Sequence, residues 1–262
     1  MSRSAAHDQR NAAFREVFRK PFEAQAAMTG TGQTIQEEAQ KLKIEHYVEE
    51  IPEGRNARLH WLGDRSAKKV LLYFHGGGFC TPAFSGHVIF WHQCQEHLKS
   101  VGHNVVVAAL EYGLTMETRY PIQIIQATEC LRFLLEKGHN PSDIVLGGDS
   151  AGANLVLAVL SVILHSFDGV QSLHLVSPLA GVLLISPWIS FDVKSSSWTE
   201  DAEKDSIPAE AAVILSAAYA DPPNYNNFSK PIRADVSWWE NMPTKAVLNI
   251  FGGYECLKVR CC

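Results

Sequence analysis

Short apolar runs alternate along this chain with longer segments in which apolar residues recur at helical spacing. Apolar runs of about four to eight residues between turn signals predict buried strands, and a polar–apolar alternation predicts a half-buried strand. By these criteria, strands are predicted at residues 44–48, 58–62, 70–74, 104–110, 143–147, 181–185 and 246–251. Helices are predicted at residues 87–101, 123–136 and 151–165.

Strands that alternate with helices indicate parallel βαβ units. We therefore predict an α/β protein, a three-layer α/β/α sandwich with a mostly parallel central sheet. Two segments depart from the alternation. Residues 1–42 are polar with a helical pattern, and we interpret them as an N-terminal helical cap segment. Residues 187–243 hold a predicted helix near 209–219 and a proline-rich loop, so we interpret them as a cap insertion within a domain of residues 43–262.

A serine lies in a glycine-rich turn between a predicted strand and a predicted helix. The turn reads Gly148-Asp149-Ser150-Ala151-Gly152, and this strand–turn–helix context is typical of a nucleophilic serine on a sharp turn. The two outer glycines avoid collisions with the neighbouring strand and helix. The helix that begins at Ala151 directs its positive end toward the site. We predict that Ser150 is a nucleophile; the alternative is a glycine-rich turn with a passive serine.

A second glycine-rich turn, His75-Gly76-Gly77-Gly78, follows its own predicted strand. Three glycines let the main chain approach a substrate closely and present its N–H groups. Two of these N–H groups, together with that of Ala151, could form an oxyanion hole, in which the loss of one donor lowers the rate by about 10²–10³. We expect His75 to hold the loop in place by hydrogen bonds rather than to act as a base. The alternatives for this turn are a flexible loop or a phosphate-binding nest.

The two motifs, in this order, resemble the α/β-hydrolase fold and, within it, the hormone-sensitive-lipase-like (fold-3) esterases. The resemblance runs from about residue 40 to residue 255. Supporting motifs are Phe79 after the glycine loop, Glu111-Tyr112-Gly113-Leu114, Tyr120-Pro121, Ala153-Asn154-Leu155 and Ser186-Pro187-Trp188. One departure is Gly113, where the family usually has Arg; we expect a looser loop there without loss of activity.

The resemblance implies a catalytic triad in the chain order serine, acid, histidine. Glu255 follows the last predicted strand and takes the place of the acid. Asp192 and Asp205 are the alternatives, although their position in the insertion suits a solvated surface. The family histidine would follow one further strand, yet no histidine follows His174, and the chain ends seven residues past Glu255. We therefore interpret the chain as C-terminally truncated, with the last strand and helix missing and an apolar sheet edge left behind.

The resemblance thus implies a serine carboxylic-ester hydrolase that acts on a small-molecule ester. Without a base the serine hydroxyl is a weak nucleophile, so we expect the chain as written to be weakly active or inactive. Among its eleven histidines, His87 is nearest the glycine loop and is the least implausible substitute base. Two alternatives stay open: a non-catalytic ligand-binding or interaction protein, and a lyase or dehydratase that reuses the oxyanion loop.

The amino-acid composition and net charge limit the kinds of partner that the chain is expected to bind. The formal net charge of −5, with scattered Lys and Arg, gives no reason to expect nucleic acid or an anionic membrane surface as a partner. The six cysteines show no metal-ligand spacing, and no motif indicates a metal or a cofactor. The polar N-terminus lacks the apolar core of a secretory signal, and no stretch reaches the about 18 consecutive apolar residues of a membrane span. We expect a cytoplasmic protein and leave its oligomeric state open.

Overall fold

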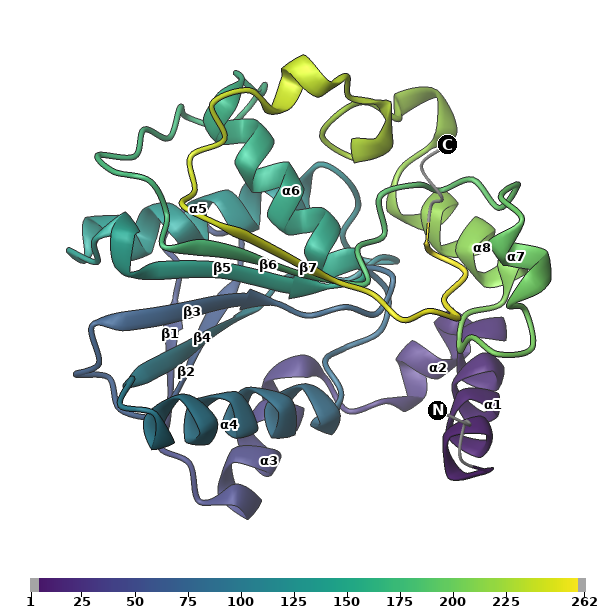
Figure 1. Cartoon of the computed structure of the whole chain (residues 1–262), viewed down its shortest axis with the longest axis horizontal. Helices are drawn as coiled ribbons and strands as arrows, with labels where there is room; N and C mark the ends of the chain where they lie inside the picture. The colour runs from purple at the N-terminus through teal and green to yellow at the C-terminus, as the bar shows by residue number, and fades with distance from the viewer. Residues whose placement is uncertain (1–4, 259–262) are drawn as a thin grey trace.

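The computed structural model describes residues 5–258, and a sheet of seven strands forms the central layer of that part of the chain (Figure 1). The strands are β1 (His46–Glu50), β2 (Arg58–Leu62), β3 (Lys69–Phe74), β4 (Val105–Glu111), β5 (Ile144–Asp149), β6 (Gly181–Ile185) and β7 (Val247–Ile250). Their order across the sheet is β1-β2-β4-β3-β5-β6-β7. The pairs β4–β3, β3–β5, β5–β6 and β6–β7 are parallel. The pairs β1–β2 and β2–β4 are antiparallel. The prediction of an α/β fold with a mostly parallel sheet is confirmed.

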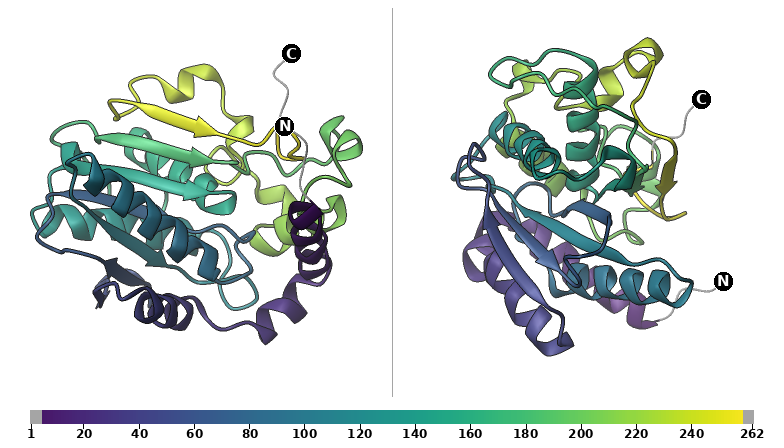
Figure 2. Two further views of the ribbon diagram at one scale, coloured as in Figure 1. Left: turned by 60° about the horizontal axis from the view of Figure 1, so that its bottom comes forward. Right: turned by 90° about the vertical axis from the view of Figure 1, so that its left-hand side faces the viewer.

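Helices cover both faces of this sheet (Figure 1 and Figure 2). One face carries α3 (Thr31–Leu42) and α4 (Ser85–Ser100), and the other carries α5 (Ile122–Glu136) and α6 (Ala151–Leu164). Alternate residues of β3 enter different apolar cores because side chains alternate across a strand. Leu71 and Tyr73 pack with α3 and α4, whereas Leu72 and Phe74 pack with α5 and α6. The apolar helix α6 is buried along most of its length, which fixes the residue that precedes it, Ser150.

Two segments far apart in sequence lie side by side beyond the carboxyl ends of the parallel strands (Figure 1). Their helices are α1 (Ala5–Arg19), α2 (Pro21–Ala27), α7 (Ser197–Glu200) and α8 (Ala209–Tyr219). Asn11 Nδ2 donates to Lys204 O at 2.7 Å, and the Arg15 guanidinium donates to Asp205 O at 2.6 Å. These contacts hold α1 against the insertion.

Short 3-10 helices complete the connections: η1 (Pro141–Asp143), η2 (Pro222–Asn224), η3 (Pro231–Arg233) and η4 (Val236–Trp239). None of the helices between residues 5 and 258 has the length and apolar character needed to cross a membrane.

The start of β1 differs from the prediction. The sequence predicts a strand at 44–48, whereas β1 begins at His46. Lys43 has a left-handed backbone (φ 56°), and Ile44 N–H donates back to Ala39 O at 2.9 Å. This is the Schellman type of helix end, and Ile44 packs against the core beneath α3. The apolar Ile44 therefore belongs to the end of α3 and not to the strand.

The last strand, β7, lies at an edge of the sheet and pairs only with β6 among the described strands. All four of its residues are exposed, and Leu248 has 58% of its surface in contact with solvent. The apolar edge expected at this strand is therefore present. Unpaired strand edges of this kind favour association with other strands.

Candidate active site

Ser150 occupies the sharp turn between β5 and α6. Its backbone angles, φ 50° and ψ −116°, are unusual for a residue with a side chain, and strain of this kind concentrates at functional sites. Ser150 N–H donates to Ile185 O at the end of β6 at 2.8 Å. A Cβ atom at Gly152 would lie 2.0 Å from Phe74 O, and one at Gly148 would lie 2.5 Å from the Gly152 carbonyl carbon. Glycine is therefore required on both sides of the serine.

The glycine loop lies next to this turn because β3 and β5 are parallel neighbours whose carboxyl ends meet at one edge of the sheet. Gly76 N–H donates to Asp149 Oδ1 at 2.9 Å, so it is not free to bind an oxyanion. This leaves Gly77 and Gly78 as the loop's donors. Their N–H groups and that of Ala151 have no acceptor among residues 5–258. The two motifs that the sequence predicts to act together are thus in contact.

Asp149, inside the serine turn, connects three elements. Besides Gly76 N–H, its carboxylate accepts hydrogen bonds from Tyr73 Oη at 3.1 Å and from His87 Nε2 at 3.3 Å. Burial alone would raise the pKa of Asp149, but His87 and the other hydrogen bonds hold that pKa below its ordinary value. Asp149 is therefore a half-buried carboxylate whose hydrogen bonds connect the glycine loop to the turn that holds Ser150. Asp149 belongs to the predicted serine motif, but the motif alone does not indicate this role.

His75 is buried, and its ring face and both ring nitrogens contact neighbouring groups. Its ring stacks on Tyr112 with centroids 4.5 Å apart, and Tyr112 Oη donates to His75 O at 2.7 Å. Nδ1 lies 2.7 Å from Gly76 O and donates to it, so Nε2 accepts from Thr31 Oγ1 at 3.4 Å. Burial and the neighbouring His87 lower the pKa of His75 to about 4. This neutral ring with both nitrogens engaged is suited to holding the loop and not to proton transfer.

Glu255 follows β7, and its side chain reaches the same region. Ser186 Oγ donates to Glu255 Oε1 at 2.7 Å, while Oε2 is buried without a hydrogen-bond partner among the described residues. Burial raises the pKa of Glu255 despite the Ser186 hydrogen bond. Ser186 belongs to the Ser186-Pro187-Trp188 motif, whose sequence alone does not indicate a contact with the predicted acid. Its hydroxyl holds the Glu255 carboxylate in place.

The two alternative acids have structural partners. Asp192 pairs with Lys230 at 2.7 Å and has 61% of its side chain exposed. Asp205 accepts hydrogen bonds from the N–H groups of Cys256 and Ser206. Asp205 thereby ties the insertion to the segment that carries Glu255, and both of its carboxylate oxygens have donors.

A cavity of about 220 Å³ brings the predicted site residues together. Its polar lining comes from Gly77, His87, Asp149, Ser150, Ser186, Asp205, Ser206 and Glu255, and its apolar lining from Phe14, Phe18, Phe84, Ile207 and Leu257. Gly78 lies beside a smaller cavity of about 20 Å³, which Ser150 and Trp188 also line. The cavity therefore combines the predicted nucleophile, a glycine of the predicted oxyanion hole and the predicted acid within an apolar wall.

His87 faces this cavity, although most of its helix was expected to face away. Its Nδ1 accepts Phe84 N–H at 2.9 Å, and its Nε2 contacts Asp149 at 3.3 Å. Burial alone would lower the pKa of His87, but the Asp149 carboxylate outweighs burial and raises it. Both ring nitrogens are committed, so neither is free to take the Ser150 proton. No other histidine within residues 5–258 lines the cavity.

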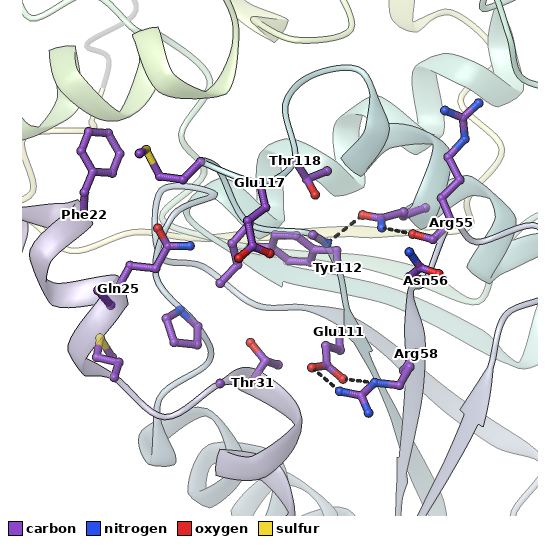
Figure 3. A pocket seen from close by; sticks show the side chains of 18 residues that line it. Phe22, Gln25, Thr31, Arg55, Asn56, Arg58, Glu111, Tyr112, Glu117 and Thr118 are labelled. Atoms are coloured by element: carbon purple, nitrogen blue, oxygen red, sulfur yellow. Dashed lines mark hydrogen bonds and ion pairs between the residues drawn. The ribbon is translucent and has the colours of Figure 1, made fainter.

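A larger cavity of about 620 Å³ lies between α2, the start of α3 and the loop after β4 (Figure 3). Figure 3 shows Arg58 and Glu111 paired in its wall, with Arg58 Nε 2.8 Å from the carboxylate. Although burial acts to raise it, hydrogen bonds from His60 and Arg58 lower the pKa of Glu111 to about 2. Neither Ser150 nor Glu255 lines this cavity. Two of its charged groups, the exposed Arg58 and the half-buried Glu111, pair with each other, and it contains none of the predicted site residues.

No group of three or more His, Cys, Asp or Glu side chains in the described part of the chain is arranged to hold a metal ion. The chemistry at this site is that of a hydroxyl, backbone N–H groups and a carboxylate, the groups used in acyl transfer.

Comparison with known proteins identifies the family of this fold. Residues 71–259 match the family model described as alpha/beta hydrolase fold. The chain is 28% identical to Esterase LipI of Mycobacterium tuberculosis over 182 residues, which cover 67% of this chain and 53% of that protein. It is 31% identical to an acetyl-hydrolase of Streptomyces hygroscopicus over 139 residues, which cover 52% of this chain and 41% of the relative. The chain thus spans about half the length of the curated relatives that it matches.

A solved structure gives the same result. An esterase from the bacterial hormone-sensitive lipase family superposes with a TM-score of 0.69 at 26% sequence identity. The match covers 98% of this chain and 81% of that one. The chain therefore belongs to the α/β-hydrolase fold family, and its predicted likeness to the hormone-sensitive-lipase-like esterases is confirmed.

Proposed function

We propose that this chain is a serine carboxylic-ester hydrolase for small-molecule esters, with Ser150 as its nucleophile. The observation that carries the proposal is the shared cavity of Ser150, Gly77 and Glu255, together with N–H groups of Gly77 and Gly78 that have no acceptor within residues 5–258. Ser150 Oγ would attack the ester carbonyl. The negative charge that forms on the carbonyl oxygen would be met by the N–H groups of Gly77, Gly78 and Ala151, which need no reorganisation.

Glu255 is the proposed acid of the triad. An acid in this role orients a histidine ring and stabilises the cation that forms when the ring takes the serine proton. Glu255 lines the cavity, but among residues 5–258 no histidine ring is hydrogen-bonded to its carboxylate. We propose that the chain as given reacts slowly for this reason, since the loss of one triad member lowers kcat by about 10⁴–10⁶ in comparable enzymes.

An acylation experiment tests the proposal. The chain is incubated with p-nitrophenyl butyrate, and peptide mapping by mass spectrometry locates the butyryl group. We expect a butyryl group on Ser150 that persists, because its hydrolysis also needs a base. Ser150→Ala is the control and removes the label from this peptide. Acylation elsewhere only, or equal ester turnover by the Ser150→Ala variant, contradicts the proposal.

A second candidate is a ligand-binding protein without catalysis. The observation that favours it is the commitment of both His87 nitrogens to other groups, which leaves Ser150 without a base. This candidate predicts that butyramide, an unreactive analogue of a short ester, binds in the cavity while Ser150 never becomes acylated. The same peptide map, combined with calorimetric titration of butyramide, separates the two functions.

A further inference from the structure

The glycine loop supplies two of the proposed oxyanion donors, the N–H groups of Gly77 and Gly78, and they are not held equally well. A peptide group is planar and trans, so the direction of its C=O fixes the direction of the N–H on the following residue. The Gly78 N–H shares a peptide with Gly77 O. This oxygen accepts from Cys80 N–H at 3.0 Å, from Thr81 N–H at 2.9 Å and from Thr81 Oγ1 at 3.2 Å. Three hydrogen bonds therefore fix the direction of the Gly78 N–H.

The peptide that carries the Gly77 N–H has one support. Its oxygen, Gly76 O, accepts from His75 Nδ1 at 2.7 Å, and no other donor to this oxygen occurs within residues 5–258. The bond requires the ring proton on Nδ1, because an unprotonated Nδ1 would bring two acceptors together. Repulsion would then turn the peptide over, since glycine on both sides leaves the backbone free to rotate. The tautomer of His75 therefore decides whether the Gly77 N–H points toward the ring or away from it.

Thr31, the first residue of α3, lies at the other nitrogen of this ring. Its Oγ1 accepts from Ala83 N–H at 3.1 Å, which leaves the hydroxyl proton to be donated. The acceptor is His75 Nε2 at 3.4 Å, and within residues 5–258 neither group has another partner for this bond. A lone pair on Nε2 leaves the ring proton on Nδ1. Thr31 and His75 are only 3% and 1% exposed, so water has little access to compete.

The start of α3 is itself fixed in place. Gly32 N–H donates to Glu111 Oε1 at 3.1 Å, and a carboxylate is favourable at a helix N-terminus. A Cβ atom at Gly32 would lie 2.8 Å from Glu111 Oε2 and 3.1 Å from Arg58 Nη2, so this close approach requires glycine. The contact between Thr31 and His75 is therefore set by a helix that precedes all the strands and turns of the predicted site.

We propose that Thr31 is a positioning residue for the oxyanion hole. Its hydroxyl keeps His75 in the tautomer with the proton on Nδ1. This tautomer holds the Gly76–Gly77 peptide with its N–H directed away from the ring and toward the cavity that Gly77 lines. This inference rests on the proposed function, because it concerns the same oxyanion donors. Thr31 does not line the cavity that contains Ser150, so it acts through His75.

Two variants of Thr31 test the effect on the reaction. Thr31→Val keeps the branched shape without a hydroxyl, whereas Thr31→Ser keeps the hydroxyl. The rate of Ser150 acylation by p-nitrophenyl butyrate is followed by release of p-nitrophenol and assigned by peptide mapping. We expect Thr31→Val to lower this rate about tenfold, the factor by which a hydrogen bond of ordinary strength shifts an equilibrium. Thr31→Ser should acylate at nearly the rate of the unmodified chain.

Thr34→Val is the matched control, because it removes a hydroxyl from the first turn of the same helix. Thr34 Oγ1 donates to Thr29 O at 3.3 Å and not to the glycine loop. This variant should leave the acylation rate unchanged. Urea unfolding shows which variants are folded under the conditions of the assay.

The tautomer of His75 is a readout that a loss of stability alone would not change. Long-range proton–nitrogen NMR of the histidine-labelled chain distinguishes a proton on Nδ1 from one on Nε2. We expect the proton on Nδ1 in the unmodified chain and in Thr31→Ser, and a mixture of both tautomers in Thr31→Val. The measurement on the unmodified chain requires no variant.

The outcomes separate this inference from the proposed function. Equal rates of Ser150 acylation in the unmodified chain and in Thr31→Val overturn the positioning role and leave the proposed function standing. A proton on Nε2 of His75 in the unmodified chain also overturns it, because Gly76 O would then lack its donor. A slower Thr31→Val variant whose His75 keeps the proton on Nδ1 overturns it as well, since the loss would not come from the tautomer. Absence of Ser150 acylation in the unmodified chain removes the proposed function and this inference together.

Discussion

The two sides of the 220 Å³ cavity are held in different ways. On one side, Ser150 and the glycine loop follow strands that are paired on both sides, and backbone contacts leave no room for side chains at the flanking glycines. On the other side, Glu255 follows the exposed edge strand β7 and is held by Ser186. The geometry of the nucleophile is therefore built into the backbone, whereas the position of the acid depends on a few side-chain contacts.

The largest difference in stability is expected between two glycine-to-alanine variants, one on each side of the cavity, each of which adds one methyl group. Gly152→Ala puts a Cβ atom 2.0 Å from Phe74 O, whereas a Cβ atom at Gly253 meets nothing within 4 Å. We expect Gly152→Ala to lower the free energy of unfolding by about 3 kcal/mol and Gly253→Ala to change it by less than about 0.5 kcal/mol. Urea unfolding measures both. Similar losses in the two variants would remove the contrast between the two sides.

The next largest effect concerns the carboxylate that joins the two glycine motifs. Asp149→Asn keeps the side-chain shape but loses the charge that Gly76 N–H and His87 contact. We expect acylation of Ser150 to slow by about 10²-fold, because the loop donors are displaced from the oxyanion position. The pKa of His87, which NMR titration measures, should fall.

Tyr73→Phe is the matched control for this variant, because it removes one hydrogen-bond donor to the Asp149 carboxylate and leaves the charge in place. It should cost about 2 kcal/mol of stability, as for a hydrogen bond to a charged group, and leave the acylation rate nearly unchanged. Acylation of the Asp149→Asn variant at the rate of the unmodified chain would show that Asp149 does not position the loop.

A smaller effect is the dependence of folding stability on pH, which differs in sign between the carboxylates of Asp149 and Glu255. The folded-state pKa of Asp149 is lowered, so its charge contributes stability that is present above the unfolded value of about 3.8 and is lost as the pH falls through the folded pKa. Glu255 has a raised pKa, so stability declines as the pH rises from about 4.5 through its folded pKa.

The opposite pKa shifts of Asp149 and Glu255 predict opposite changes in folding stability for two variants at neutral pH. Glu255→Gln should be more stable than the unmodified chain by at most about 1 kcal/mol, whereas Asp149→Asn should be less stable. Unfolding in urea across a pH series gives both slopes. A Glu255→Gln variant that is destabilised at neutral pH would mean that its carboxylate stabilises the fold.

The smallest effect concerns the edge strand itself. Leu248→Lys replaces an exposed apolar residue on β7, so the free energy of unfolding should change by less than about 0.5 kcal/mol. Self-association at high concentration, measured by light scattering, should decrease because a charge protects a strand edge. Val213→Lys on α8, where Val213 is 50% exposed, is the control and should not change association. An equal decrease in both variants would point to net charge as the cause.

The sequence predicted one side of the cavity better than the other for a physical reason. Parallel strands such as β3 and β5 are apolar along their whole length, and the glycines after them are dictated by backbone contacts, so both leave a local pattern. The roles of Ser186, His87 and the Asp149 hydrogen bonds depend on packing between distant segments, which has no local pattern. The boundary between α3 and β1 was misplaced because Ile44, apolar in either role, caps the helix. The catalytic roles of Ser150 and Glu255 stay predictions.

The contact of α1 with the insertion provides a way to measure ligand binding in the cavity. Phe14 and Phe18 of α1 and Leu257 near the opposite end of the described chain form walls of one cavity. A molecule that occupies it can bind fully only when both segments are docked, so occupancy must stabilise their docking by mass action. The rate at which a protease cleaves between α1 and α2 should therefore fall as the cavity fills. Cleavage at this remote junction would report binding even for ligands that never react.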